Sequence, residues 1–179
     1  MLQNCSTMKV AGIFFDEPTI PHYLIEISKK SRLAHTSTKK YLISLKKEGI
    51  ISETIEKKGK RNFPTFKANL ENQSYKQQKT VHNILKIYNS GLINFLRDNC
   101  TPKVIILFGS YSRGEDTEKS DIDVFVESKK RALNFKKFEG ALKRKIEIHF
   151  NNSFNNYPKE LKNNILNGNV LYGYLEAFK

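Results

Sequence analysis

The sequence predicts an α+β protein built from two differently patterned parts. Residues from about 7 to 67 follow the order helix, helix, helix, hairpin, whereas residues from about 103 to 178 alternate between strand and helix. A polar, helix-favouring stretch lies between the two patterns. We therefore expect an N-terminal domain over residues 1–70, a connecting helix over 71–98, and a C-terminal domain over 99–179 with a small mixed sheet flanked by helices.

Three helices are predicted in the first part. The first is capped by Thr7, and the second carries Pro21 in its first turn, where a missing N–H group costs little. The third begins near residues 36–37 and ends at Gly49, which favours the left-handed conformation that closes helices.

A basic hairpin follows the third helix. Residues 50–54 lead into a charged turn at 56–61 around Gly59, and residues 63–66 return along it. Three short helices followed by a basic hairpin resemble a winged helix-turn-helix domain, and residues 36–66 carry this resemblance.

The resemblance to a winged helix implies a surface that binds duplex DNA. The polar, cationic N-terminal half of the third helix suits a DNA major groove, and the hairpin tip could meet phosphates. The expected DNA-binding residues are Ser37, Lys39, Lys40, Tyr41, Lys60 and Arg61. The alternative is a winged helix that serves dimerisation or protein docking.

The charge of the chain agrees with a polyanionic partner. The formal net charge of the 179 residues is +13, of which +7 falls on the first 70 residues and +6 on the remaining 109. Each neutralised phosphate releases a counterion, which favours binding, although a solvated Lys-rich surface would have the same composition. Lys outnumbers Arg, which favours nonspecific charge contacts over bidentate reading of bases.

Composition also excludes several classes of protein. Hydrophobic residues make up 39% of the chain, enough for a buried core, so we expect neither a disordered nor a fibrous protein. No stretch approaches the roughly 20 apolar residues of a membrane span, and residues 1–10 lack a signal-peptide run, so we expect a cytoplasmic protein without a membrane partner. Cys5 and Cys100 are too few for a disulfide framework or a four-cysteine zinc site, and free thiols are expected.

A long helix is predicted over residues 74–97, between the two parts. Its apolar positions are spaced by four and three residues, which is a narrow seam close to a heptad repeat. The seam consists of Val81, Leu85, Tyr88, Leu92 and Phe95. Gly91 weakens the helix locally. The seam packs against the next domain or, alternatively, forms the interface of a homodimer.

Residues that can carry chemistry follow a predicted buried strand. The apolar run at 103–108 suits such a strand and is followed at once by Gly109 and Ser110. After ten more residues, Asp121 and Asp123 open the next strand. Residues two apart on a strand point to the same face, so the two carboxylates are expected side by side.

This arrangement favours a metal-nucleotide site. Two ionised carboxylates on one face repel each other unless a cation lies between them, and hard oxygen ligands suit Mg²⁺, usually completed by substrate phosphates and water. Gly109 lets the backbone approach a ligand closely, and Ser110 offers a hydroxyl and nearby N–H groups at a helix start. Arg113, one helical turn later, could reach the same phosphates.

The spacing Gly-Ser, ten residues, Asp-x-Asp resembles the nucleotidyltransferase superfamily of the DNA polymerase beta type, in particular its minimal nucleotidyltransferase branch. The resemblance spans about residues 103–174, and the ending at 160–173 is also similar to that branch. Together with the N-terminal resemblance, it implies a winged helix domain followed by a minimal nucleotidyltransferase domain.

Domains of this superfamily usually carry a third carboxylate on a later strand. In the segment "RKIEIHF", polar and apolar residues alternate and place Glu147 on the polar face, where many relatives have Asp. Glu139 is the competing acid, on a helix predicted over 131–142. We expect His149 to be a half-exposed strand residue rather than a ligand.

The resemblance also implies a mechanism and partners. Asp121, Asp123 and Glu147 would hold two Mg²⁺ ions that bridge to a nucleoside triphosphate, with ATP as the expected donor. An acceptor hydroxyl would attack the α-phosphorus and pyrophosphate would leave, with Glu147 completing the metal site or helping to deprotonate the acceptor. The acceptor is expected on a partner protein, such as a HEPN-type toxin that the chain would counter as an antitoxin. The alternative is a DNA-binding transcriptional regulator whose second domain only senses nucleotide or binds a partner.

Overall fold

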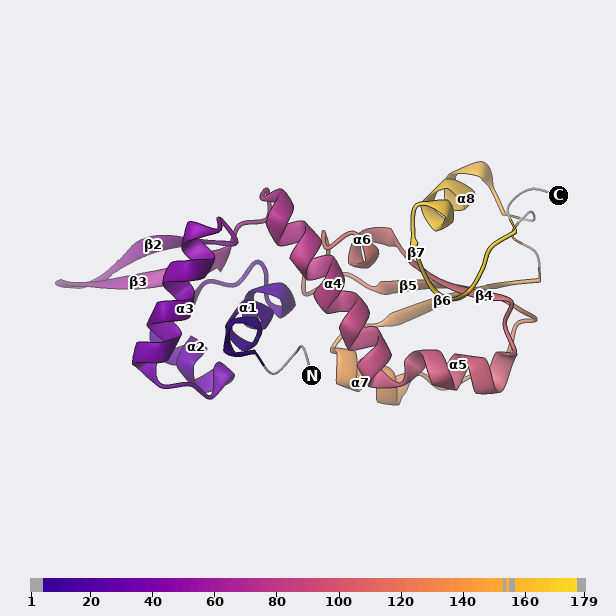
Figure 1. Cartoon of the computed structure of the whole chain (residues 1–179), viewed down its shortest axis with the longest axis horizontal. Coiled ribbons are helices and arrows are strands. Elements are labelled where there is room, and N and C mark those ends of the chain that lie inside the picture. Colours follow the sequence, from indigo (N-terminus) through magenta and orange to yellow (C-terminus); the bar gives the residue numbers. More distant parts are fainter. Residues whose placement is uncertain (1–4, 153, 155–156, 177–179) are drawn as a thin grey trace. The chain divides into compact units, whose positions relative to one another are not determined.

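The structure, a computed structural model, describes residues 5–152, 154 and 157–176 (Figure 1). It has the α+β composition that the sequence predicts, with helices and two small sheets among the described residues. The chain divides into two compact units, the first ending at Lys79 and the second beginning at Thr80. The predicted boundaries at residues 70 and 98 remain a prediction.

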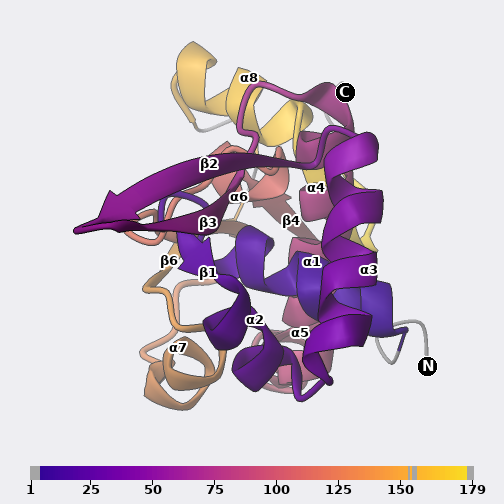
Figure 2. The same cartoon turned by 90° about the vertical axis from the view of Figure 1, so that its left-hand side faces the viewer.

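The first unit places helices against a three-stranded antiparallel sheet (Figure 2). Its elements are α1 (Ser6–Asp16), β1 (His22–Tyr23), α2 (Leu24–Ser31), α3 (His35–Lys47), β2 (Ile51–Lys58) and β3 (Arg61–Ala68). The sheet has the strand order β1-β3-β2, and β2 and β3 form a hairpin that turns at Gly59, where φ is +61°. The core of the unit is apolar, with Phe14, Ile27 and Leu42 almost fully buried.

Two helix starts in this unit differ from the predicted ones. The N-cap of α1 is Cys5, so Thr7 lies inside the helix instead of capping it. Pro21 precedes β1 instead of occupying the first turn of a helix, because β1 pairs with β3. The second helix therefore starts only after Tyr23, whose backbone N–H donates to Glu26 Oε2 at 3.0 Å.

The second unit is built on a four-stranded mixed sheet. Its elements are the end of α4 (Gln73–Ser90), α5 (Leu92–Cys100), β4 (Val104–Phe108), α6 (Gly109–Ser112), β5 (Ile122–Glu127), α7 (Lys136–Leu142), β6 (Ile146–Asn151), α8 (Lys159–Leu166) and β7 (Asn169–Gly173). The strand order is β6-β5-β4-β7. Strand β4 is antiparallel to β5 and β7, whereas β5 and β6 run parallel, so the sheet is mixed as predicted.

Each face of this sheet is covered by its own core. Leu107 and Val124 pack into a core with residues of α4, α5 and α7, whereas Phe108 and Phe125 pack into a smaller core with α8. Figure 1 shows α8 on one side of the sheet and α5 and α7 on the other. Because side chains alternate along β5, Asp123 shares the face of Phe125 and the smaller core.

The long helix predicted over residues 74–97 is interrupted. Helix α4 ends directly before Gly91 and α5 begins directly after it, because Gly91 takes the left-handed conformation with φ +80°. The predicted apolar seam is therefore not continuous. Val81 and Tyr88 are 55% and 46% exposed, whereas Leu92 is fully buried in the core.

The helix predicted over 131–142 is also shorter than expected. It begins only at Lys136, whose backbone N–H donates to Asn134 Oδ1 at 3.0 Å. An Asn that accepts this bond stabilises a local turn in place of a further helical turn. The helix then covers the sheet with Phe138 and Leu142.

Both cysteines carry free thiols, as the sequence predicts. Cys5 is exposed, and Cys100 is buried at the end of α5. Burial raises the pKa of the Cys100 thiol, because a buried site disfavours the charged thiolate. Among the described helices, none combines the length and apolar character needed to cross a bilayer.

A buried polar cluster fixes the loop between α6 and β5. Asp116 is 1% exposed, and its Oδ1 accepts a hydrogen bond of 2.8 Å from Asn83 Nδ2. Asn83 also donates to the carbonyl of Tyr111 at 2.9 Å, and Arg144 Nη2 lies 3.9 Å from Asp116 Oδ2. The cluster thus joins α4, the loop and the turn between α7 and β6.

Replacing Asp116 with Ala should destabilise the second unit strongly. The change removes the buried carboxylate that accepts the Asn83 hydrogen bond and lies 3.9 Å from Arg144 Nη2, and breaking a buried ion pair typically costs about 3–5 kcal/mol. Urea unfolding of the full chain measures this loss, and Glu115→Ala, which removes an exposed carboxylate one residue away, is the control. Equal unfolding midpoints for Asp116→Ala and the wild type would show that the cluster does not hold the loop.

Candidate active site

Gly109 and Asp123 form a tight pair at the end of β4. Asp123 lies opposite Phe108 in the antiparallel register of β4 and β5, and Gly109 follows with φ +75°. A Cβ on residue 109 would lie 2.3 Å from Asp123 Oδ2. Glycine is therefore required both by the backbone conformation and by the carboxylate beside it.

The parallel pairing of β5 and β6 brings the other polar groups to Asp123. Glu147 is its register partner, and His149 is the partner of Phe125. His149 Nε2 lies 3.8 Å from Asp123 Oδ1 and 3.7 Å from Glu147 Oε1, and one ligand atom from each residue lies within 4.8 Å of the others. Two carboxylates and an imidazole at this spacing form a donor set that fits a divalent cation.

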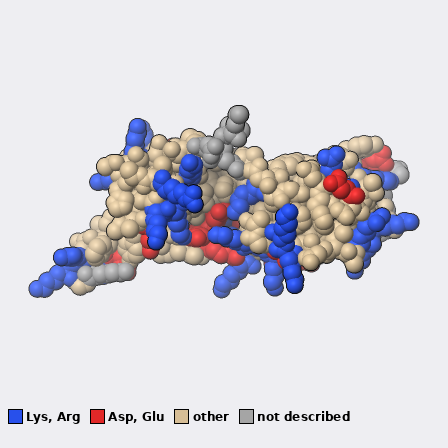
Figure 3. All heavy atoms as spheres, turned by 90° about the horizontal axis from the view of Figure 1, so that it is seen from below, with Lys and Arg blue, Asp and Glu red and all other residues tan. Residues whose placement is uncertain are grey.

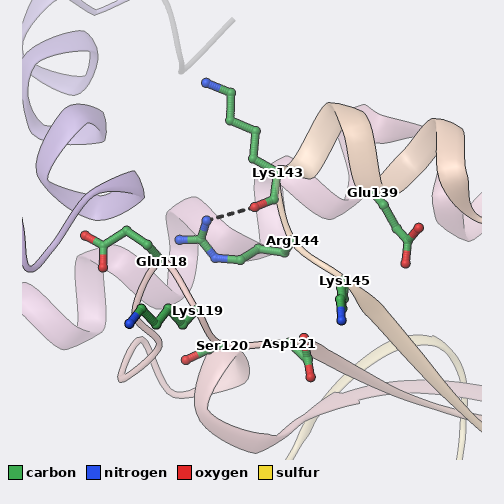
Figure 4. Close-up of a pocket in the computed structure, with 8 residues that line it drawn as sticks. All are labelled: Glu118, Lys119, Ser120, Asp121, Glu139, Lys143, Arg144 and Lys145. Carbon is green, nitrogen blue, oxygen red and sulfur yellow. Dashed lines mark hydrogen bonds between the residues drawn. The ribbon is translucent and has the colours of Figure 1, made fainter.

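Asp121 is not part of this three-residue group. It is exposed, and it precedes β5, whose first residue Ile122 donates its N–H to the Lys145 carbonyl at 2.8 Å. Asp121 instead lines a cavity of about 520 Å³ next to the starts of β5 and β6 (Figure 4). The lining residues are Glu118, Lys119, Ser120, Asp121, Glu139, Lys143, Arg144 and Lys145. The predicted same-face arrangement of Asp121 and Asp123 remains a prediction, because Asp121 precedes β5, which begins at Ile122.

Ser110 and Arg113 lie close to the Gly109 turn. Ser110 is in α6 and half-buried, and its carbonyl accepts the N–H groups of Arg113 at 3.1 Å and Glu115 at 3.0 Å. Arg113 Nε donates to Glu115 Oε2 at 2.7 Å on the surface. Exposed ion pairs contribute only about 0–1 kcal/mol, so this pair holds the guanidinium weakly.

The two acids that compete for the third carboxylate position differ in their surroundings. Glu139 Oε1 accepts the backbone N–H of Ile146 at 3.1 Å and so supports the start of β6. Glu147 has a 61% exposed side chain beside Asp123 and His149. Within the described part of the chain, Glu147 rather than Glu139 belongs to the group around Asp123.

His149 was expected to be a half-exposed strand residue rather than a ligand, but the structure brings it to the group around Asp123. Its side chain is 23% exposed, as expected for a strand residue, yet it points to both carboxylates. The signal was available, because residues 147 and 149 share one face by strand alternation.

The expected DNA-binding residues lie on two elements of the first unit. Ser37, Lys39 and Lys40 are exposed on α3, whereas Tyr41 is half-buried and packs against the core. Lys60 and Arg61 are exposed where β2 turns into β3. Figure 3 shows basic side chains gathered at this hairpin tip.

Comparison with known proteins supports the nucleotidyltransferase superfamily for the second unit. The sequence family described as "Polymerase beta, Nucleotidyltransferase" matches residues 90–176. A Methanocaldococcus jannaschii protein named "Putative protein adenylyltransferase" is 62% identical over 32 residues, which are 18% of this chain and 32% of that protein. The chain thus spans about a third of that relative's length. These similarities support a transferase.

Part of the chain is also similar to a solved structure. It is described as a "Possible transcriptional regulator" from Methanosarcina mazei Go1, with a TM-score of 0.38 and 16% sequence identity. The similarity covers 54% of this chain and 78% of that chain. A TM-score this low supports no conclusion about fold or function.

Proposed function

We propose that the protein transfers a nucleoside monophosphate, with ATP as the donor, to a hydroxyl group on a partner protein. The observation that carries the proposal is the pairing of Asp123 with Glu147 beside Gly109, inside the part of the chain that matches the nucleotidyltransferase family. The three expected metal ligands are Asp121, Asp123 and Glu147, and Mg²⁺ is the expected ion.

Different residues of the chain bind the triphosphate and activate the acceptor in this reaction. The backbone at Gly109, the Ser110 hydroxyl and the Arg113 guanidinium bind the triphosphate. Glu147, exposed at the edge of the site, accepts the proton of the acceptor hydroxyl as the hydroxyl attacks the α-phosphorus and pyrophosphate leaves. Divalent cations bound by the carboxylates would neutralise charge on the attacking and leaving oxygens.

A protein acceptor is supported by two observations. The similar Methanocaldococcus jannaschii protein is named "Putative protein adenylyltransferase". The 61% exposure of the Glu147 side chain leaves the acceptor side open to a large substrate. The resemblance to the minimal nucleotidyltransferase branch suggests a HEPN-type partner protein, and we propose the product of the neighbouring gene as the first candidate.

A labelling experiment tests this function directly. The chain and the candidate partner are incubated with Mg²⁺ and either [α-³²P]ATP or [γ-³²P]ATP. Label from the α position alone should enter the partner, because nucleotidyl transfer retains the α-phosphate and releases the other two. Label from the γ position would mean phosphoryl transfer, and label from neither would favour a domain that only senses nucleotide.

We further propose that the first unit is a winged helix that binds duplex DNA. Its order of elements, with three helices, a short strand and a final hairpin, supports this fold. The exposed Lys39 and Lys40 on α3 and the exposed Lys60 and Arg61 at the hairpin tip support an electrostatic contact with phosphates. DNA binding supports a second candidate function. In it, the protein is a transcriptional regulator whose nucleotidyltransferase domain only senses nucleotide.

The DNA proposal predicts a steep salt dependence. The full chain should bind duplex DNA with an affinity that falls as salt rises, and each lost phosphate contact should reduce the logarithmic salt slope by about 1. Gel shifts of Lys39→Ala/Lys40→Ala and Lys60→Ala/Arg61→Ala measure the change. The control is Lys136→Ala/Lys137→Ala, which removes two exposed charges from α7. If the wild-type chain causes no gel shift of DNA at low salt, the DNA proposal is wrong and the first unit is better explained as a protein-docking module.

A further inference from the structure

The imidazole of His149 lies at the right distances to share an ion with the two carboxylates. Ligand atoms bonded to one ion at about 2.0–2.2 Å are separated by roughly 3.0–4.4 Å, depending on the angle between them. The separations of His149 Nε2 from Asp123 Oδ1 and Glu147 Oε1, 3.8 Å and 3.7 Å, fall in this range. Both are too long for direct hydrogen bonds.

The same nitrogen has no hydrogen bond to satisfy it. His149 Nε2 is buried and without a hydrogen-bond partner in the described part of the chain. Leaving a buried polar atom unsatisfied costs about 1–3 kcal/mol. The ring is held in place by edge contact with Phe108, with centroids 5.1 Å apart and planes at 62°. A fixed and unsatisfied nitrogen that faces two carboxylates is the arrangement of a metal ligand.

We infer that His149 is a third ligand of the cation held by Asp123 and Glu147, and that this ligand makes the site prefer a transition metal such as Mn²⁺ over Mg²⁺. The inference deepens the proposed function, on whose metal site it rests. Imidazole nitrogen adds affinity for transition metals, whereas Mg²⁺ prefers oxygen and readily keeps water at the same position.

Metal binding without nucleotide tests the inference independently of catalysis. Titration of the full chain with Mn²⁺, followed by the electron paramagnetic resonance of the free ion, gives the Mn²⁺ affinity, and competition gives that of Mg²⁺. His149→Ala should lower the Mn²⁺ affinity by at least about tenfold, which is the lower end of the effects seen when groups around a bound metal are removed. The Mg²⁺ affinity should change much less. His35→Ala, which removes an exposed histidine from α3, is the control.

A spectroscopic measurement detects the metal ligand directly in the unaltered chain. Electron spin echo modulation of bound Mn²⁺ should contain the ¹⁴N couplings of a directly bound imidazole, and His149→Gln should remove them. Modulation without ¹⁴N couplings, or equal Mn²⁺ affinities for wild type and His149→Ala, would overturn the inference and leave His149 as a neighbour of the carboxylates that binds no metal. Tight Mn²⁺ binding with ¹⁴N couplings but no transfer to a partner would instead leave the inference intact and count against the proposed function.

Discussion

Asp123→Asn is expected to abolish nucleotidyl transfer, with a loss of about 10³-fold or more, equivalent to ~4 kcal/mol of barrier. Asp123 lies against the Gly109 turn and close to both Glu147 and His149. The change therefore removes the negative charge at the centre of this group of possible metal ligands. Folding should survive, because Asn occupies the same space beside Gly109 and relieves the repulsion between the two carboxylates.

Transfer of label from [α-³²P]ATP measures the loss of activity, and calorimetric titration with Mg-ATP measures the loss of nucleotide binding. Asp121→Asn should also stop transfer, but it should weaken cation binding without nucleotide less than Asp123→Asn, because Asp121 lies outside the group around His149. Asp98→Asn, the same exchange at an exposed position of α5, is the matched control. If both active-site variants bind Mg-ATP as tightly as the wild type, Asp121 and Asp123 do not form the nucleotide site.

The elements that carry the site could be predicted because their signals are local. The buried strand β4 is a continuous apolar run, and in the next strand Asp123 is the polar residue within a short, otherwise apolar stretch that ends at Val126. Gly109 is also a local signal, and the sequence predicts it as a position where the backbone approaches a ligand. The structure shows that Gly109 makes room for Asp123 itself, in addition to any ligand.

The parts that could not be predicted depend on non-local pairing or on small energies. The parallel register that sets Glu147 opposite Asp123 joins segments more than twenty residues apart, so only the family resemblance, and no local pattern, placed Glu147 at the site. The same pairing brings His149, which shares the face of Glu147, close to Asp123. At Gly91, a glycine inside a helix costs only about 1 kcal/mol, so its presence alone does not separate a weakened helix from an interrupted one. The left-handed φ of Gly91 decides this point.

Glu147→Gln is expected to keep most of the Mg-ATP affinity but to lower the transfer rate by about 10²-fold or more, the range of a lost general base. The side chain is the most exposed of the group around Asp123 and lies on its open side, where an acceptor hydroxyl would approach. Gln preserves the shape of the side chain and still offers one oxygen, but it cannot take up the proton.

Transfer rates at saturating ATP test this assignment, with three variants compared. Glu147→Asp should retain part of the activity, because the carboxylate is kept with a shorter reach. Glu139→Gln should be close to the wild type, because the amide oxygen can still accept the Ile146 N–H that Glu139 Oε1 accepts at 3.1 Å. An unchanged rate for Glu147→Gln together with a loss for Glu139→Gln would mean that Glu139 is the third carboxylate.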